Sequence, residues 1–234
     1  MEVTSTELQS NFGTYLKYSQ YEDVHITRNG KIVAVLQGLD ELQFSEEAKI
    51  YGEKKERLTL EQFLDFAERS TEHYEFIDGE VILMASPSFQ HQNCVLELAT
   101  MFREWASNKD CRAVVAPFDV LLQASDTINV VQPDVVIICD QENVDSQGRY
   151  RGVPSLVVEV LSESNRSHDL IKKLEVYRGG GVNEYWIVNP FRQEILTYTF
   201  IDYEVQDYRV YGKELKLAST ACSGLVVAVD EVFL

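Results

Sequence analysis

The sequence predicts an α/β protein: a mixed sheet flanked by helices, preceded by a small α+β module. Apolar strand-like runs alternate with helical stretches through residues 58–234, which is typical of a layered α/β domain. Residues 1–45 instead combine a short helical part with a β-hairpin pattern, and the polar, charged stretch 46–57 resembles a helical linker. We therefore expect a small module, a linker and one larger domain.

The N-terminal module carries signals for both of its element types. Thr4 or Ser5 can cap a short helix, and a second helical stretch follows. The pair Asn29-Gly30 lies between two apolar runs, and Asn-Gly is the strongest two-residue hairpin signal. A unit of this size buries little surface by itself, so we expect residues 1–36 to contribute to a homodimer interface.

The larger domain is predicted element by element from capping residues, periodicity and turn signals. The expected elements, in chain order, are a helix from Thr59, strands over 74–77 and 81–84, a helix over 91–105, strands over 112–117, 120–122, 131–139 and 156–161, a helix over 168–179, and strands over 185–188, 194–200, 204–211 and 225–229. We expect the last three strands to complete a meander.

Composition narrows the classes of function. Hydrophobic residues make up 45% of the chain and charged residues 25%, which is enough to build a core and too apolar for a disordered protein. The net charge of −17 argues against a protein that coats nucleic acid by charge alone. An enzyme that acts on a polyanion remains compatible with this charge, because bound divalent cations offset it locally.

The sequence also suggests a compartment. It contains no run of 18 or more apolar residues and no basic start followed by an apolar run, so we expect neither a membrane span nor a secretory signal. The four cysteines form no CxxC pair and do not cluster with histidines, which argues against a zinc site. Scattered cysteines in an unexported chain are expected to be reduced thiols, and we place the protein in the cytoplasm.

Two acidic residues stand in strands where acids are not expected. Asp134 follows Pro133 and precedes four apolar residues, and Glu159 lies within the apolar run 156–161. An unpaired carboxylate in such a strand costs several kcal/mol. A divalent metal held between the two strands would offset that cost, since Mg²⁺ binds carboxylate oxygens, a backbone carbonyl such as that of Val160, and water. The alternative is that Asp134 caps a strand and Glu159 pairs with a core Arg or Lys.

The residues around these two acids resemble those of a known family. Pro133-Asp134 followed by Glu159 in an apolar strand resembles the PD-(D/E)XK nuclease superfamily, and the resemblance is closer to one of its bacterial branches, the Uma-two family. It covers about residues 58–230, through 74–80 (YEFIDGE), Ser86-Pro87 with His91, 132–134 (QPD), 152–162 (GVPSLVVEVLS), Asp169-Leu170 with Lys173-Leu174 and Tyr177, and 181–190 (GVNEYWIVNP). The resemblance implies a restriction endonuclease-like fold and an endonuclease that depends on Mg²⁺ or Mn²⁺.

One position departs from the superfamily pattern. Leu161 stands two residues after the glutamate, where the superfamily places a lysine. The Uma-two pattern places a lysine at Lys173 instead, in a helix expected to pack beside the Glu159 strand at a solvent-facing position. The alternative is that Lys173 is a surface lysine paired with Asp169 four residues earlier. Lys172, the adjacent lysine, is the residue most easily mistaken for it.

The chemistry that the resemblance implies is hydrolysis of phosphodiester bonds in nucleic acid, with DNA as the expected substrate. Asp134 and Glu159 would hold the metal, which acidifies a bound water. Lys173 would orient the nucleophile or neutralise developing charge. Glu75 is either a further ligand, or the acid that positions the metal-bound water, or a strand-edge acid. His91, at the start of a helix, either contacts a phosphate or caps the helix.

Residues 1–36 resemble the prevent-host-death (Phd/YefM) antitoxin domain. The matching residues are Val3, Glu7, Asn11, Phe12, Leu16, 26–31 (ITRNGK) and 34–36 (AVL). In that family the module dimerises and binds operator DNA. Three basic and six acidic residues give residues 1–43 a net charge of −3, so dimerisation is the property that we expect to carry over. The alternative is a packing appendage of the nuclease-like domain.

Two hypotheses of different class follow. The first is a metal-dependent endonuclease, which the two acids and a nearby lysine favour. The second is a catalytically weak or inactive nuclease-fold regulator or interaction protein of toxin–antitoxin type, which the displaced lysine and the net charge of −17 favour.

Overall fold

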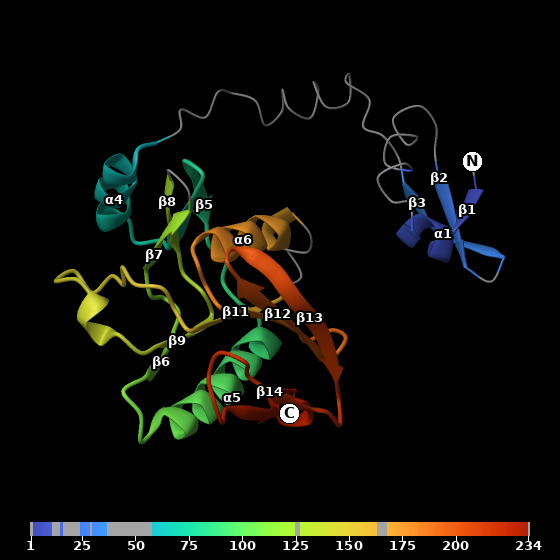
Figure 1. Cartoon of the computed structure of the whole chain (residues 1–234). Helices are drawn as coiled ribbons and strands as arrows, with labels where there is room; N and C mark the ends of the chain where they lie inside the picture. The colour runs from blue at the N-terminus through green and yellow to red at the C-terminus, as the bar shows by residue number, and fades with distance from the viewer. Residues whose placement is uncertain are drawn as a thin grey trace. The chain divides into compact units, whose positions relative to one another are not determined.

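The computed structural model of the chain describes residues 2–10, 15, 24–28, 30–36, 58–124, 127–162 and 168–233. It divides the chain into two compact units, Met1–Glu56 and Arg57–Leu234 (Figure 1). The linker predicted over 46–57, and all but Tyr15 of the second helical stretch predicted in the first unit, lie outside the described residues.

The first unit contains a three-stranded sheet in the order β1-β2-β3. Its elements are β1 (Glu2–Thr4), α1 (Ser5–Ser10), β2 (Val24–Arg28) and β3 (Lys31–Leu36). Thr4 Oγ1 accepts a hydrogen bond from the Glu7 amide at 3.2 Å, so Thr4 caps the helix as expected. β2 and β3 form the predicted antiparallel hairpin, with Gly30 at a φ of 72° in its turn. The sequence did not reveal β1, because three residues are too few to show alternation.

The second unit is built around a six-stranded sheet in the order β13-β12-β11-β10-β9-β6. The sheet is mixed, since β10 and β11 are parallel while the other neighbours are antiparallel. Its strands are β6 (Arg112–Val115), β9 (Val135–Ile138), β10 (Leu156–Val160), β11 (Glu184–Asn189), β12 (Glu194–Ile201) and β13 (Glu204–Gly212).

A second, smaller sheet has four strands in the order β5-β4-β8-β7. Its strands are β4 (Tyr74–Ile77), β5 (Glu80–Leu83), β7 (Val120–Ala124) and β8 (Thr127–Val131). Asp78 and Gly79 have φ angles of 52° and 83°, as the tight turn between β4 and β5 requires. α4 (Leu60–Arg69) packs on β4, where the ring of Phe63 stacks on that of Phe76 at 4.9 Å between centroids.

The expected single sheet and the expected strand over 131–139 are corrected by this topology. Residues 132–134 interrupt the apolar run, so β8 ends in the smaller sheet and β9 begins in the larger one. Pro133 has no amide to donate to a ladder, which explains the break, whereas the apolar pattern alone concealed it. The strand expected near 225–229 likewise leaves the meander. β14 (Lys216–Ala218) and β15 (Val226–Ala228) form a separate two-stranded ribbon.

Helices cover both faces of the larger sheet. α5 (Phe89–Ala106) packs on one face, where Leu98 and Phe102 meet Trp186 of β11. α6 (His168–Gly179) covers the other face, where Tyr177 meets Tyr185. Successive residues of β11 therefore pack in the two hydrophobic cores on opposite faces of the sheet. The remaining elements are η1 (Gln141–Asn143) and α7 (Val229–Val232). Among the helices in the described ranges, none combines the length and apolar character that a membrane crossing would need.

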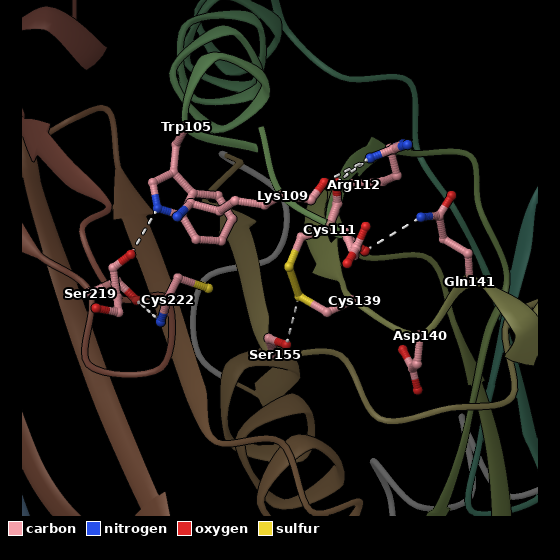
Figure 2. The surroundings of a disulfide bond; sticks show 12 residues. Trp105, Lys109, Cys111, Arg112, Cys139, Asp140, Gln141, Ser155, Ser219 and Cys222 are labelled. Atoms are coloured by element: carbon pink, nitrogen blue, oxygen red, sulfur yellow. Dashed lines mark hydrogen bonds between the residues drawn. A yellow bond between two sulfur atoms is a disulfide. The ribbon is translucent and has the colours of Figure 1, made fainter. Parts of the chain in front are cut away.

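The cysteines do not all remain thiols. Cys111 and Cys139 form a disulfide, so the expectation that all four are reduced is wrong for this pair (Figure 2). Arg112 pairs with Ile138 in the ladder between β6 and β9, so the preceding and following cysteines face each other. A sequence separation of 28 residues hid this pairing, because only the strand register creates it. Cys94 and Cys222 are buried thiols, and burial raises the pKa of each to about 11.

Candidate active site

Asp134 lies at the point where the chain passes from the smaller sheet to the larger one. Its Oδ2 accepts a hydrogen bond from the Val160 amide at 2.7 Å and lies 3.1 Å from His91 Nε2. Asp134 directly precedes β9, and β9 neighbours β10, which carries Glu159. The crossing thus places Asp134 against the strand that holds the second acid.

His91 belongs to the first turn of α5, but it does not cap the helix. Ser88 Oγ accepts a hydrogen bond from the His91 amide at 3.3 Å and supplies the cap. The imidazole is buried and reaches Asp134 instead. Its other nitrogen, Nδ1, is buried and has no hydrogen-bond partner among the described residues. His91 and the Val160 amide therefore hold the same oxygen of Asp134.

Lys173 bridges two buried carboxylates. Its Nζ lies 2.9 Å from Glu75 Oε1 and 2.9 Å from Glu159 Oε1. The three side chains come from β4, α6 and β10, so this cluster joins both sheets and one helix. Glu159 does pair with a core lysine, as the structural alternative expected, and that lysine is the one singled out for catalysis.

The expected solvent-facing position of Lys173 is wrong. The residue is only 5% exposed, because α6 lies directly on the face of the larger sheet that carries Glu159. Tyr177, one helical turn later, donates its hydroxyl to the same Glu159 oxygen. Lys172 instead pairs with Glu80 at 2.7 Å and is more exposed.

Glu75 is an interior residue, so the strand-edge alternative does not describe it. β4 lies between β5 and β8, and Glu75 is 1% exposed. Its Oε1 accepts a hydrogen bond from the Gln132 amide at 2.9 Å as well as from Lys173. The segment between β8 and β9 therefore contacts Glu75 through the Gln132 amide and also supplies Asp134, which contacts the strand that carries Glu159.

The cluster of Glu75, Asp134, Glu159 and Lys173 contains more carboxyl groups than ammonium groups. Burial raises the pKa of Glu159 to about 8; the Lys173 ammonium acts in the opposite direction, and the carboxylates of Asp134 and Glu75 raise the pKa further. Burial and the neighbouring Glu159 carboxylate also raise the pKa of Tyr177. Three carboxyl groups share one buried ammonium, so an additional cation would be favoured here.

A cavity of about 590 Å³ joins these groups. All six residues singled out from the sequence contribute to its lining: Glu75, His91, Asp134, Glu159, Val160 and Lys173. The other walls come from β5, the segment before α5 and the segment after β10. A volume of this size accommodates a small ligand or a nucleotide-sized part of a larger one.

The donor atoms suit a hard divalent cation that keeps part of its water shell. One oxygen of Asp134 and one of Glu159 make no hydrogen bond or ion pair with the described residues. The Val160 amide points to Asp134, and a strand residue directs its amide and carbonyl to the same side, so the Val160 carbonyl faces Asp134 too. Within the described ranges, no three His, Cys, Asp or Glu side chains converge as a complete ligand set. Two carboxylates, a carbonyl and waters are the ligands that Mg²⁺ commonly uses.

Two residues of the cluster were not singled out as site residues from the sequence. Tyr177 lies four residues after Lys173, a spacing that places both on one helix face, so the sequence held a signal for it. Gln132 acts through its backbone amide, while its side chain bonds to Asp119 at 2.8 Å. No residue-type pattern reports a backbone contact of that kind.

Comparison with known proteins identifies the family to which the second unit belongs. The model of the Uma2 (Uma-two) family, described as "Putative restriction endonuclease", matches residues 60–230. This chain belongs to the Uma2 family. Two proteins of Synechocystis sp. (strain PCC 6803), both described as uncharacterized, are similar to it. The protein slr1290 is 30% identical over 76% of this chain and 92% of its own length. The protein sll1609 is 28% identical over 66% of this chain and 82% of its own length.

A solved structure supports the fold of this Uma2 chain. The crystal structure of a protein from Anabaena variabilis, titled a putative nuclease belonging to DUF820, is similar with a TM-score of 0.63. It is 18% identical, and the similarity covers 75% of this chain and 97% of that one. At this identity the likeness establishes a shared α/β fold with several sheets. The Uma2 match begins at residue 60, so it leaves the first unit outside.

Proposed function

We propose that this Uma2 chain is a metal-dependent endonuclease that hydrolyses phosphodiester bonds of nucleic acid, with DNA as the expected substrate. The observation that carries the proposal is the cluster in the cavity. A buried lysine there bridges two carboxylates beside a third, Asp134, in a chain whose family model is described as "Putative restriction endonuclease". Perturbed acids that line a cavity together with a fixed cation are typical of catalytic sites.

Each residue has a role that follows from its contacts. Asp134 and Glu159, with the Val160 carbonyl, would hold Mg²⁺ or Mn²⁺. When bound, such an ion supplies an acidified water and stabilises charge on the phosphate oxygens. His91 and the Val160 amide fix the orientation of Asp134. Glu75 holds the Lys173 ammonium beside Glu159, from where it can donate to the nucleophile or to a phosphate oxygen.

A plasmid-nicking assay with Mg²⁺ or Mn²⁺ tests this proposal. Asp134→Ala should lower the nicking rate by at least about 10²-fold, the scale of losing a preorganised charge-stabilising group. Asp65→Ala is the matched control, because Asp65 is an exposed acid on α4 that pairs only with Arg69 at 2.6 Å among the described residues. Equal nicking by wild type and Asp134→Ala would remove Asp134 from the chemistry.

The second candidate function is a nuclease-fold regulator of toxin–antitoxin type. The incomplete ligand set among the described residues and the net charge of −17 favour it. Single-stranded and duplex DNA and RNA should therefore be offered with each metal. A folded wild-type protein that binds no Mn²⁺ and cleaves none of these substrates would favour the regulator.

We also propose that residues 1–36 act as an antitoxin-type dimerisation module. The support is its small core, which contains only Val3, Tyr15 and Val24 as buried hydrophobic residues among those described. Ile32, Val33 and Val35 of β3 are exposed, and a partner surface would cover them. Deleting residues 1–45 should weaken self-association measured by light scattering. A truncated protein with the association constant of the full chain would contradict this role.

A further inference from the structure

The outermost strand of the larger sheet is long and uncovered. β13 spans Glu204–Gly212 at the edge of the sheet (Figure 1), and its first seven residues are all exposed. Its inner side pairs with β12, and within the described ranges no strand pairs with its outer side. An exposed edge of this length is a template for the addition of another strand, and native proteins normally cover or interrupt such edges.

A row of tyrosines reaches this edge and stops there. Tyr185, Tyr198 and Tyr208 lie on successive strands β11, β12 and β13 and share the face that α6 covers further in. Their rings stack with centroid distances of 6.2 Å and 6.0 Å. Tyr208 is 62% exposed, and Val205 and Val210 of the same strand are also exposed. The apolar face of the sheet therefore continues to the last strand without a cover at its end.

The sequence of β13 is complementary to itself in one register. Residues directly opposite each other in an antiparallel pair share a face, so a strand that pairs with its own copy is centred on a residue. Centring on Asp207 or on Arg209 would place like charges opposite each other. Centring on Tyr208 instead places Asp207 opposite Arg209 of the second copy, twice by symmetry. Asp207 and Arg209 already form an exposed ion pair within the strand at 2.8 Å.

We propose that β13 pairs antiparallel with β13 of a second copy, about a two-fold axis at Tyr208. The larger sheets of the two copies then form one continuous sheet, and the tyrosine row continues from Tyr208 to Tyr208 of the second copy. The contact is isologous, so one strand supplies both sides of it. It is independent of the proposed chemistry, and it uses none of the residues of the first unit.

Charge exchange in the full-length protein tests the register. Asp207→Arg and Arg209→Asp each create two like-charge pairs and should weaken self-association about tenfold, since a cross-strand charge pair contributes about 0.2–1 kcal/mol. The double variant should restore association to within about threefold of wild type. Mixing the two single variants should also restore it, because every opposing pair then carries opposite charges. Asp65→Arg is the matched control and should leave self-association unchanged.

Sedimentation velocity over a range of concentrations gives these constants, and circular dichroism checks that each variant is folded. A strictly monomeric wild type would overturn the proposal. If Asp207→Arg and Arg209→Asp associate like wild type, the proposal is also overturned, and the first unit becomes the contact between copies. A double variant or a mixture that fails to recover would overturn the register.

Cysteine cross-linking provides a second measurement that does not depend on affinity. Residues opposite each other across the two-fold axis have Cβ atoms about 5 Å apart, within reach of a disulfide after a small adjustment. Tyr208→Cys should therefore cross-link with its own copy under mild oxidation. Val210→Cys lies two residues from the axis, so its two copies would be well separated, and it should not cross-link. Equal cross-linking of the two variants would overturn the two-fold axis at Tyr208.

Discussion

Glu159 and Glu184 are both buried acids on neighbouring strands of the larger sheet, yet their surroundings differ completely. Glu184 accepts hydrogen bonds from Trp186 Nε1 at 2.8 Å and Ser219 Oγ at 2.5 Å. It also accepts from the amides of Thr220 and Ala221 at 3.0 Å and 2.9 Å. All four donors are neutral, and the three from Ser219, Thr220 and Ala221 tie β11 to the turn between β14 and β15. Glu159 instead faces an ammonium, a phenol and two further carboxyl groups in a cavity.

The difference shows that burial of an acid does not by itself indicate function. Glu184 has its hydrogen-bonding capacity filled by fixed neutral donors, as structural buried carboxylates do. Glu159 keeps one oxygen without a partner among the described residues, and its neighbours carry more negative than positive charge. A carboxylate in the second situation remains able to accept a cation. The two residues should therefore respond to the same substitution in opposite ways.

The largest expected effect is on cleavage, from Glu159→Gln. This change keeps the size of the side chain but removes a proposed metal ligand, so the nicking rate should fall by about 10³-fold or more. Glu184→Gln should leave nicking unchanged and lower the free energy of unfolding by about 1–3 kcal/mol, because its amide nitrogen cannot accept all of the donors that the carboxylate accepts. Nicking assays and urea unfolding measure the two quantities.

The reverse pattern would break the comparison between the two glutamates. If Glu184→Gln abolishes nicking in a fully folded protein, or if Glu159→Gln merely destabilises, then Glu159 is a structural acid. The lysine beside it would then be structural as well, and the regulator would become the better description.

Lys173→Ala is expected to lower nicking by about 10²–10³-fold. Because Lys173 is buried between Glu75 and Glu159, its loss should also destabilise the protein, by roughly 3–5 kcal/mol if the carboxylates stay ionised. Lys172→Ala is the matched control: it lines the same cavity one residue earlier, and its partially exposed pair with Glu80 is of little energetic weight. Rates measured at a temperature where both variants are folded separate the two effects. Similar rates for the two variants would contradict a catalytic Lys173.

Much of the fold could be predicted because its signals are local. The helix at Thr59, the turn at Asp78-Gly79 and the apolar strand around Glu159 are each recorded in a few adjacent residues. Asp134 and Glu159 could be singled out for a related reason, whereas Lys173 was singled out from the family resemblance. Acids in apolar strands contradict the pattern around them, and that contradiction is visible in the sequence.

What could not be predicted depends on how the strands are arranged. The division into two sheets follows from the break at 132–134, the disulfide from the register of β6 with β9, and the burial of Lys173 from the position of α6. None of these is a property of neighbouring residues. Glu184 shows the converse, since its four donors include residues more than 30 positions away, and nothing in the sequence near it marks it as satisfied.

The pH dependence of stability should report on the surroundings of Glu159 without any substrate. The pKa of Glu159 is raised in the fold from 4.5 to about 8, so its neutral form is favoured. Its contribution to stability is fully present below about pH 4.5 and is lost as the pH rises through about 8. Melting curves of the metal-free protein should show this loss between pH 5 and 8, and Glu159→Gln should lack it.

Metal binding should reverse that loss. At pH 8, Mn²⁺ at about 100 times its dissociation constant should stabilise wild type by about 2.7 kcal/mol, and Glu184→Gln by the same amount. Asp134→Ala and Glu159→Gln should gain much less. A stabilisation by Mn²⁺ that is equal in all four proteins would place the ion elsewhere, whatever their nicking rates.

The smallest expected effect sharpens the comparison at the level of a single hydroxyl group. Tyr177 donates to Glu159, which lines the cavity, and Tyr150, equally buried, donates to Asp140, which does not. Tyr177→Phe and Tyr150→Phe each remove one hydrogen bond to a carboxylate, so each should lower the free energy of unfolding by about 1–3 kcal/mol.

Tyr177→Phe alone should also lower nicking, by about tenfold, because Glu159 then loses one of the two donors that orient it, and misplaced groups are costly in catalysis. The defect should lie in kcat and in Mn²⁺ affinity rather than in the fold, since Lys173 still pairs with Glu159. Equal nicking by the two variants would mean that Lys173 alone orients Glu159 and that Tyr177 serves only the core beneath α6.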